Sequence, residues 1–381
     1  MKFIPLYIHI PFCRSKCSYC AFYSCTENSP LLRERFLDQL LTQIESYREL
    51  SGADFFKTIY MGGGTPSLLS VENLKRLFDF LGMYINSSLE EFSIECNPED
   101  ITEEFISFLN RSPVNRISLG VQSFNDDVLR KSGRKVDSRT INRAIDRIRQ
   151  NWKGRFSIDI ISGLPGQTLE NQKEDIKKAV FSGVDHISCY SLILEENTPL
   201  SENRKYIPES EEEEMMWTIC HDFLIHSDFK HYEISNYSRS HNESLHNLQY
   251  WKMNEYIGCG PGAVSMIYHE GIKRITNPQD VNDFMKGHEE IIEPFDFLFE
   301  NFMMGLRTEK GIDREEFFKR FSHYPEDFIV HTMAEEKENT FRMTHSHFSL
   351  SDDSRMFMNR ILIKIYDELS RNTIDFPINW P

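Results

Sequence analysis

The first 200 residues alternate between short apolar segments and longer amphipathic ones, and this alternation limits the fold more than any other feature of the sequence. The short segments are rich in Ile, Val, Tyr and Phe, which is typical of buried parallel strands. They fall at 3–10, 57–61, 91–96, 116–121, 156–161 and 186–192. The segments between them have the spacing of helices with one buried face, at 31–50, 71–84, 102–109, 138–150 and 169–182.

Repeated strand–helix units predict an α/β fold in which parallel strands are joined by right-handed helical crossovers. The sheet could be open and doubly wound, or it could close into a complete or partial barrel. Both arrangements bring the carboxyl ends of the strands to one face, so we expect the functional side chains to lie there.

The character of the sequence changes after residue 208. A run of four glutamates at 211–214 suits the positive end of a helix dipole and predicts a helix that reaches about residue 227. Residues 237–262 are rich in His, Asn, Tyr and Gly, so we expect mainly loops there. Amphipathic helices are expected at 295–307, 314–321 and 353–372. We therefore predict two domains, 1–235 and 236–381, which suits a length of 381 residues.

The charge balance and the apolar segments exclude several classes of protein. The chain has 43 Lys and Arg against 59 Asp and Glu, a formal net charge of −16. Because a protein needs clustered Lys and Arg to neutralise phosphates, broad nucleic-acid binding is not expected. No apolar run approaches the roughly 20 residues of a membrane-spanning helix. The apolar start of the chain is broken by His9 and Pro11, unlike a signal peptide. We expect a cytoplasmic protein, with transient contacts to membrane proteins left open.

Half of the eight cysteines fall within the first 25 residues, which is unlike a short, cysteine-dense disulfide scaffold. Cys13, Cys17 and Cys20 have C-x3-C-x2-C spacing directly after the first predicted strand. Three thiolates in one tight loop can bind a soft metal centre, and an iron–sulfur cubane held this way keeps one iron open. A zinc site stays open as an alternative because His9 and Cys25 are nearby. Three thiols without a metal would be the plainest alternative.

Polar residues and glycines follow the other predicted strands at their carboxyl ends. The segment 62–66 (GGGTP) follows the second strand, and glycines allow a ligand to approach the backbone closely. Glu95 ends the third strand, Gln122 the fourth, and Asp159 lies inside the apolar segment 158–161. A lone carboxylate in an apolar strand is costly unless it is paired. A tight turn and an internal salt bridge would explain these features separately, but their common face favours one binding site.

The segment 7–13 (YIHIPFC), the three-cysteine loop, the triple glycine and Gln122 together resemble the radical S-adenosylmethionine family. More narrowly they resemble its coproporphyrinogen III oxidase-like branch, which contains an anaerobic dehydrogenase and heme chaperones. The similarity covers nearly the whole chain, because 300–313 and 355–369 resemble the C-terminal domain of that branch. The resemblance implies a partial (β/α)6 TIM-like barrel followed by a smaller, mainly helical domain.

The resemblance also implies the site. Cys13, Cys17 and Cys20 would ligate a [4Fe–4S] cluster whose fourth iron binds the amino and carboxylate groups of S-adenosylmethionine. The positions that match contacts to this cofactor in the branch are Tyr7, Tyr19, Gly63, Gly64, Thr65, Glu95, Gln122, Arg134 and Asp159. Gly63, Gly64 and Thr65 would receive the ammonium end. Arg134 would bind the carboxylate, and Glu95 and Asp159 would accept hydrogen bonds from the ribose.

Two features distinguish members of the branch. The dehydrogenase has a further cysteine two residues after the cluster motif, where this chain has Phe22. The segment 246–251 (HNLQYW) resembles the HNxxYW segment of the heme chaperones, in which His246 would ligate heme iron beside aromatic side chains. On composition alone, His246 would be a packed loop histidine.

We therefore expect a chaperone that binds heme and delivers it to acceptor proteins such as respiratory enzymes, with an electron donor for the cluster left open. No catalytic residue is assigned. The alternative is an oxygen-independent coproporphyrinogen III dehydrogenase, and a zinc-binding structural protein is a third reading.

Overall fold

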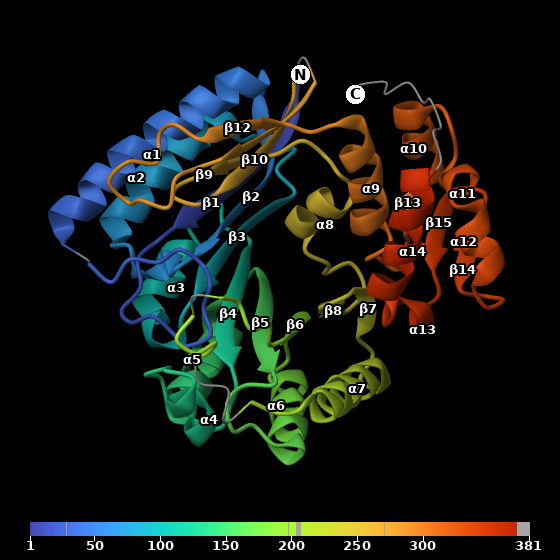
Figure 1. Cartoon of the computed structure of the whole chain (residues 1–381). Helices are drawn as coiled ribbons and strands as arrows, with labels where there is room; N and C mark the ends of the chain where they lie inside the picture. The colour runs from blue at the N-terminus through green and yellow to red at the C-terminus, as the bar shows by residue number, and fades with distance from the viewer. Residues whose placement is uncertain (28, 197, 203–206, 270, 372–381) are drawn as a thin grey trace.

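The fold is taken from a computed structural model that describes residues 1–381 except 28, 197, 203–206, 270 and 372–381. Its centre is a nine-stranded sheet with the order β7-β8-β6-β5-β4-β3-β2-β1-β9 (Figure 1). The strands are β1 (Phe3–Ile10), β2 (Phe55–Gly63), β3 (Glu91–Cys96), β4 (Arg116–Gln122), β5 (Arg155–Ser162), β6 (His186–Ser191), β7 (Lys230–Glu233), β8 (Asn236–Ser238) and β9 (Ile257–Cys259).

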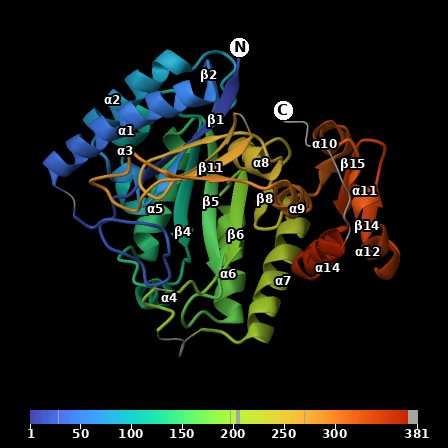
Figure 2. The same cartoon turned by 45° about the horizontal axis from the view of Figure 1, so that its top comes forward.

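Strands β1 to β6 run parallel in sequence order, as the alternating sequence predicted. The helices of this part are α1 (Pro30–Ser51), α2 (Val71–Leu81), α3 (Glu103–Leu109), α4 (Asp126–Lys131), α5 (Ser138–Asn151), α6 (Leu169–Phe181), α7 (Ser210–His226) and α8 (Leu245–Trp251). The predicted partial (β/α)6 barrel is confirmed, and its short helix α4 was not predicted. Figure 2 shows β4, β5 and β6 side by side, with α1 and α2 over the β1–β2 side.

Polar side chains fix where the crossover helices begin. Ser70, Thr102, Asp137 and Thr168 each accept a hydrogen bond from a backbone N–H in the first turn of the helix that follows. Such caps satisfy donors that have no partner inside the helix. The helix predicted over 71–84 ends at Leu81, and residues 82–84 form a 3-10 turn.

The remaining elements, coloured orange to red in Figure 1, fall in two places: the first three lie beside β1 and β9, and the others lie beside the β7–β8 edge of the sheet. They are β10 (Val264–Tyr268), β11 (Ile272–Thr276), β12 (His288–Ile291), α9 (Pro294–Gly305), β13 (Ile312–Asp313), α10 (Arg314–Phe321), α11 (Pro325–Phe328), α12 (Val330–Glu335), β14 (Phe341–Met343), β15 (His347–Leu350), α13 (Asp352–Arg355) and α14 (Met358–Arg371). Helices dominate, as predicted, but two small antiparallel sheets accompany them.

Two expectations for the second half need correction. The segment 237–262 has the expected loops at 239–244, 252–256 and 260–262, but it also contains α8 and parts of the large sheet, β8 and β9. The helix expected over 353–372 is divided into α13 and α14, and its last residue lies outside the described residues.

The boundary expected between residues 235 and 236 falls within one hairpin of the large sheet, since β7 pairs with β8. Most side chains of a second apolar core, including Phe297, Phe302 and Phe317, come from Ile292 onward. The division into two domains at 235 stays a prediction. None of the described helices is both long and apolar enough to cross a membrane.

Candidate functional site

The three-cysteine loop leaves the carboxyl end of β1 and closes on itself. The backbone N–H of Cys13 donates to the carbonyl of Cys25 at 3.0 Å, and the N–H of Cys25 donates to the carbonyl of Pro11 at 2.7 Å. Cys25 therefore holds the loop closed through its backbone. Cys13, Cys17 and Cys20 all have half-buried side chains.

The surroundings of Cys13 and Cys20 favour the neutral thiol when no metal is bound. Burial raises the pKa of Cys13 and of Cys20, and the neighbouring Cys17 adds to both shifts. Thr65 Oγ1 lies 3.8 Å from the sulfur of Cys13 and offsets part of the shift. No three metal-ligating side chains of the described residues converge tightly enough to hold one ion. Thiolates that hold a cubane bind different irons, so they lie further apart than the ligands of a single zinc ion.

The triple glycine lies against the cysteine loop because it has no side chains. A Cβ at Gly63 would lie 2.5 Å from Cε1 of His9, and the φ angle of Gly63 is +106°, which side chains disfavour. A Cβ at Gly64 would lie 2.7 Å from the carbonyl carbon of Pro11. The backbone after β2 can therefore reach the cysteine loop only with glycine at these positions.

Glu95 projects from β3 into the space beside the triple glycine. Its carboxylate accepts hydrogen bonds from the Tyr60 hydroxyl at 2.9 Å and from the N–H of Gly63 at 3.2 Å. Burial, and secondly the charge of Asp159, raise the pKa of Glu95 to about 7. Two nearby carboxylates in a poorly solvated space favour cationic or hydrogen-bond-donating ligands.

Gln122 ends β4, and Asp159 lies on the neighbouring strand β5. Both carboxylate oxygens of Asp159 accept from the Ser118 hydroxyl, at 3.1 and 3.0 Å, and burial raises its pKa. Gln122 has a φ of +68° and lies where the β4–β5 register shifts. Its Oε1 is buried and has no hydrogen-bond partner among the described residues. A strained residue with an unsatisfied buried oxygen is typical of a ligand site.

Arg134, after α4, reaches back to the same strand ends. Its guanidinium donates to the carbonyl of Gly120 and, at 3.4 Å, to Oδ1 of Asn97. The side-chain amide of Asn97 donates to Thr65 Oγ1 at 3.1 Å. The pKa of Tyr19 is raised by burial, although the charge of Arg134 opposes the shift. The strand-end residues are thus tied to each other and to the cysteine loop.

Sequence reasoning missed two residues of this face, Tyr60 and Ser118. The ring of Tyr60 stacks on Tyr7, with centroids 6.3 Å apart. The hydroxyl of Tyr7 lies 3.1 Å from Nδ1 of His9, and burial raises the Tyr7 pKa. Both missed residues lie two positions before a strand-end glycine, so the period-2 alternation of strands could have identified them.

The ring of His246 packs against Tyr60 of this group, with centroids 5.4 Å apart, but its two nitrogens face Thr58 and Tyr250. Its Nδ1 is 2.9 Å from Thr58 Oγ1, its Nε2 is 2.7 Å from the Tyr250 hydroxyl, and its side chain is fully buried. The Glu91 carboxylate accepts from the backbone N–H groups of Leu245 and His246 and fixes the start of α8. Neither ring nitrogen is open to a ligand in this arrangement. Heme ligation by His246 stays a prediction that would require α8 to move.

Known proteins resemble this chain in both sequence and fold. The model of the radical SAM superfamily matches residues 7–179. The chain is 35% identical to the heme chaperone HemW of Buchnera aphidicola subsp. Schizaphis graminum over 94% of this chain and 97% of that protein. It is 34% identical to the Bacillus subtilis HemW over 83% of this chain and 86% of that protein. It is 30% identical to the Escherichia coli HemW over 94% of this chain and 97% of that protein. The chain belongs to the HemW family of radical SAM proteins.

The fold agrees with this assignment to the HemW family. The Escherichia coli coproporphyrinogen III oxidase HemN, a radical SAM enzyme, superposes with a TM-score of 0.80 over 96% of this chain and 90% of its own, at 20% identity. That likeness shows a shared fold. Membership of the radical SAM superfamily implies a [4Fe–4S] cluster and S-adenosylmethionine. The three thiols, the close backbone approach at Gly64 and the unsatisfied Gln122 oxygen fit these groups.

Proposed function

We propose that this protein is a heme chaperone that binds heme and delivers it to acceptor proteins, on a scaffold that holds a [4Fe–4S] cluster and S-adenosylmethionine. The observation that carries the proposal is 30–35% identity to curated heme chaperones over most of both chains. Phe22, whose side chain is 66% exposed, occupies the position where the dehydrogenase has a further cysteine. That substitution favours the chaperone over the dehydrogenase.

In this proposal Cys13, Cys17 and Cys20 bind three irons of the cluster. Their place on one loop, which the backbone of Cys25 closes, supports the assignment. When bound, the cluster with S-adenosylmethionine supplies one-electron chemistry. The protein's part is to hold the thiolates, and burial that raises the pKa of Cys13 and Cys20 makes their deprotonation depend on the metal.

The residues that would bind S-adenosylmethionine are assigned from their places at the strand ends and from their hydrogen-bond partners. Gly63, Gly64 and Thr65 offer backbone and hydroxyl oxygens to the ammonium group, and Arg134 offers its guanidinium to the carboxylate. Tyr7 and Tyr19 supply aromatic surface for the sulfonium. Glu95 and Asp159 accept from the ribose, and the unpartnered oxygen of Gln122 is available to a donor on the nucleoside.

Cytoplasmic location, respiratory enzymes as acceptors and an electron donor for the cluster belong to the same proposal. So does the division into a radical SAM domain, 1–235, and a C-terminal domain, 236–381. The second core that begins near Ile292 supports a separate C-terminal unit, although with a later boundary.

The proposal is tested with anaerobically purified protein. We expect about four irons and four sulfides per chain, a loss of both in Cys17→Ser, and their retention in Cys25→Ser, the matched control. Stoichiometric zinc instead of iron would overturn the cluster. Hemin should shift its Soret band on binding. Robust conversion of coproporphyrinogen III to protoporphyrinogen would overturn the chaperone in favour of the dehydrogenase.

A further inference from the structure

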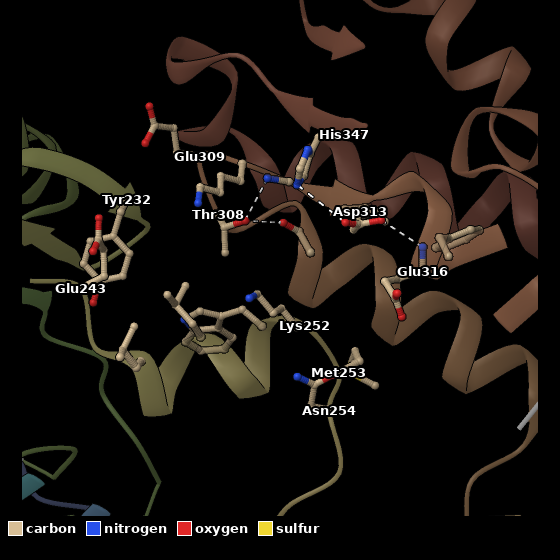
Figure 3. A pocket seen from close by; sticks show the side chains of 18 of the residues that line it. Tyr232, Glu243, Lys252, Met253, Asn254, Thr308, Glu309, Asp313, Glu316 and His347 are labelled. Carbon is tan, nitrogen blue, oxygen red and sulfur yellow. Dashed lines mark hydrogen bonds and ion pairs between the residues drawn. The ribbon is translucent and has the colours of Figure 1, made fainter. Parts of the chain in front are cut away.

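A cavity of 740 Å³ lies between α8 and the C-terminal elements, away from the cysteine loop (Figure 3). Its lining comes from β7, α8, the turn after α9, α10 and the first residue of β15. Figure 3 shows Tyr232 and Glu243 on one wall and His347, Asp313 and Glu316 on the other. The volume lies within the range of about 300–1,000 Å³ found for small-molecule and cofactor sites.

His347 presents an imidazole to this cavity in an orientation suited to a metal. Its Nδ1 is 2.8 Å from the Ser346 hydroxyl, and its Nε2 is 4.0 Å from a carboxylate oxygen of Asp313. With the proton on Nδ1 donated to this hydroxyl, the lone pair is on Nε2, and a metal bound there would replace the contact with Asp313. Metal-binding histidines are commonly oriented by such a partner on the other nitrogen. His246, in contrast, has both nitrogens engaged.

Part of the lining is apolar and suits a flat apolar ligand. Leu248 and Trp251 reach it from α8, and Ile312 and Phe317 from the C-terminal unit. The guanidinium of Arg307 lies 4.4 Å from the Trp251 ring centroid and holds that ring in place. An indole and aliphatic side chains are the surfaces that bury a macrocycle most effectively.

Three lysines line the cavity, Lys230, Lys252 and Lys310, and the last two suit anionic substituents of a ligand. Lys252 and Lys310 form no ion pair within the described part of the chain. Partial burial, with the charges of Lys57 and Lys310, lowers the pKa of Lys252. The acidic residues near His347 are already engaged: Asp313 caps α10, and Glu316 pairs with Lys319 at 2.8 Å. A ligand carboxylate beside the two lysines would relieve their repulsion.

We infer that this cavity is the heme site, with His347 as an axial ligand and Lys252 and Lys310 as partners of the propionates. The inference rests on the proposed chaperone function and deepens it by locating the cargo. It gives Trp251 of the HNxxYW segment a direct part in binding. It makes His246 a positioning residue that packs α8 against Thr58 and thereby sets the cavity wall.

The test is hemin titration of the full chain, followed by absorption and resonance Raman spectra. In His347→Ala we expect affinity to fall by about tenfold or more, with loss of the histidine–iron band. Added imidazole should restore that band. His345→Ala, an exposed neighbour outside the lining, is the matched control. Lys252→Ala should weaken binding several-fold, and the exposed Lys319→Ala should leave it unchanged.

The outcomes separate the two proposals. Wild-type protein that gives no Soret shift would overturn the chaperone function itself. Wild-type binding that is unchanged in affinity and spectrum in both His347→Ala and Lys252→Ala would overturn only the location. Loss of the histidine–iron band in His246→Ala, with the band intact in His347→Ala, would move the ligand to α8.

Discussion

Replacing Glu91 with glutamine removes the carboxylate that anchors α8 to the barrel. In the wild-type protein this carboxylate is fully buried and accepts from the Ser93 hydroxyl at 2.9 Å, the Leu245 N–H at 2.9 Å and the His246 N–H at 3.4 Å. Nη1 of Arg155 lies 3.6 Å away. Glu91 therefore joins the start of β3 to the helix that carries the HNxxYW segment.

The magnitude follows from the charges left behind. Burial alone would raise the pKa of Glu91, but Arg116, Arg155 and the Leu245 N–H lower it. Arg116 is only 2% exposed, so a neutral residue at 91 leaves it without its compensating charge. Breaking a buried pair in this way costs about 3–5 kcal/mol. Because glutamine keeps one accepting oxygen, we expect about 3 kcal/mol for Glu91→Gln and a larger loss for Glu91→Ala.

The assay is urea unfolding at pH 7, together with hydrogen exchange of residues 244–251. A local loss of about 3 kcal/mol corresponds to amide exchange roughly 100-fold faster in α8. Glu90→Gln is the control, because Glu90 is exposed and its pair with Lys57 at 3.7 Å is worth about 0–1 kcal/mol. If both variants unfold at the same urea concentration and exchange alike, the anchoring argument is wrong.

The pH dependence gives a second check on Glu91. Its pKa is lower in the folded protein than in the unfolded chain, so the unfolded chain binds more protons in acid. The contribution of Glu91 is therefore complete above its ordinary pKa of about 4.3 and is lost as the pH falls toward the folded-state pKa. The difference between wild type and Glu91→Gln should shrink below about pH 4.

Three further predictions concern the site and the second core. In the cluster-free protein the pKa of Glu95 is about 7, so folding favours its protonated form and the free energy of unfolding should fall from pH 5 to pH 8. Glu95→Gln should flatten this slope in urea unfolding, and an unchanged slope would contradict the assignment. Gly63→Ala should lower the free energy of unfolding by more than about 1 kcal/mol and reduce the iron content, because Gly63 has a φ of +106° and its new Cβ would meet the His9 ring. Gly82→Ala, with nothing within 4 Å of the new Cβ, should leave both measurements near wild type. Phe317→Ala should cost about 3–5 kcal/mol in thermal or urea unfolding, and the 43% exposed Phe318→Ala less than about 1 kcal/mol; equal losses would refute the position of the second core.

The parallel sheet, and the side chains that lie with the cysteine loop at its strand ends, follow from the amino-acid sequence. Strand and helix periodicities come from local burial, so β1, β3 and α10 agree with prediction to the residue. Parallel strands also bring their carboxyl ends together, and this is why Glu95 and Asp159 could be assigned to one face before their positions were known.

The surroundings of the histidines and the fold of the second half depend on contacts between residues far apart in the sequence. The sequence singled out His246 and gave no signal for His347, but His246 is enclosed by Thr58 and Tyr250 whereas His347 lines a cavity. Segment 237–262 forms a helix and strands because Glu91, Arg116 and the sheet edges supply partners more than 100 residues away. Contacts between residues so far apart in the sequence leave no periodic pattern, so they cannot be predicted from local sequence.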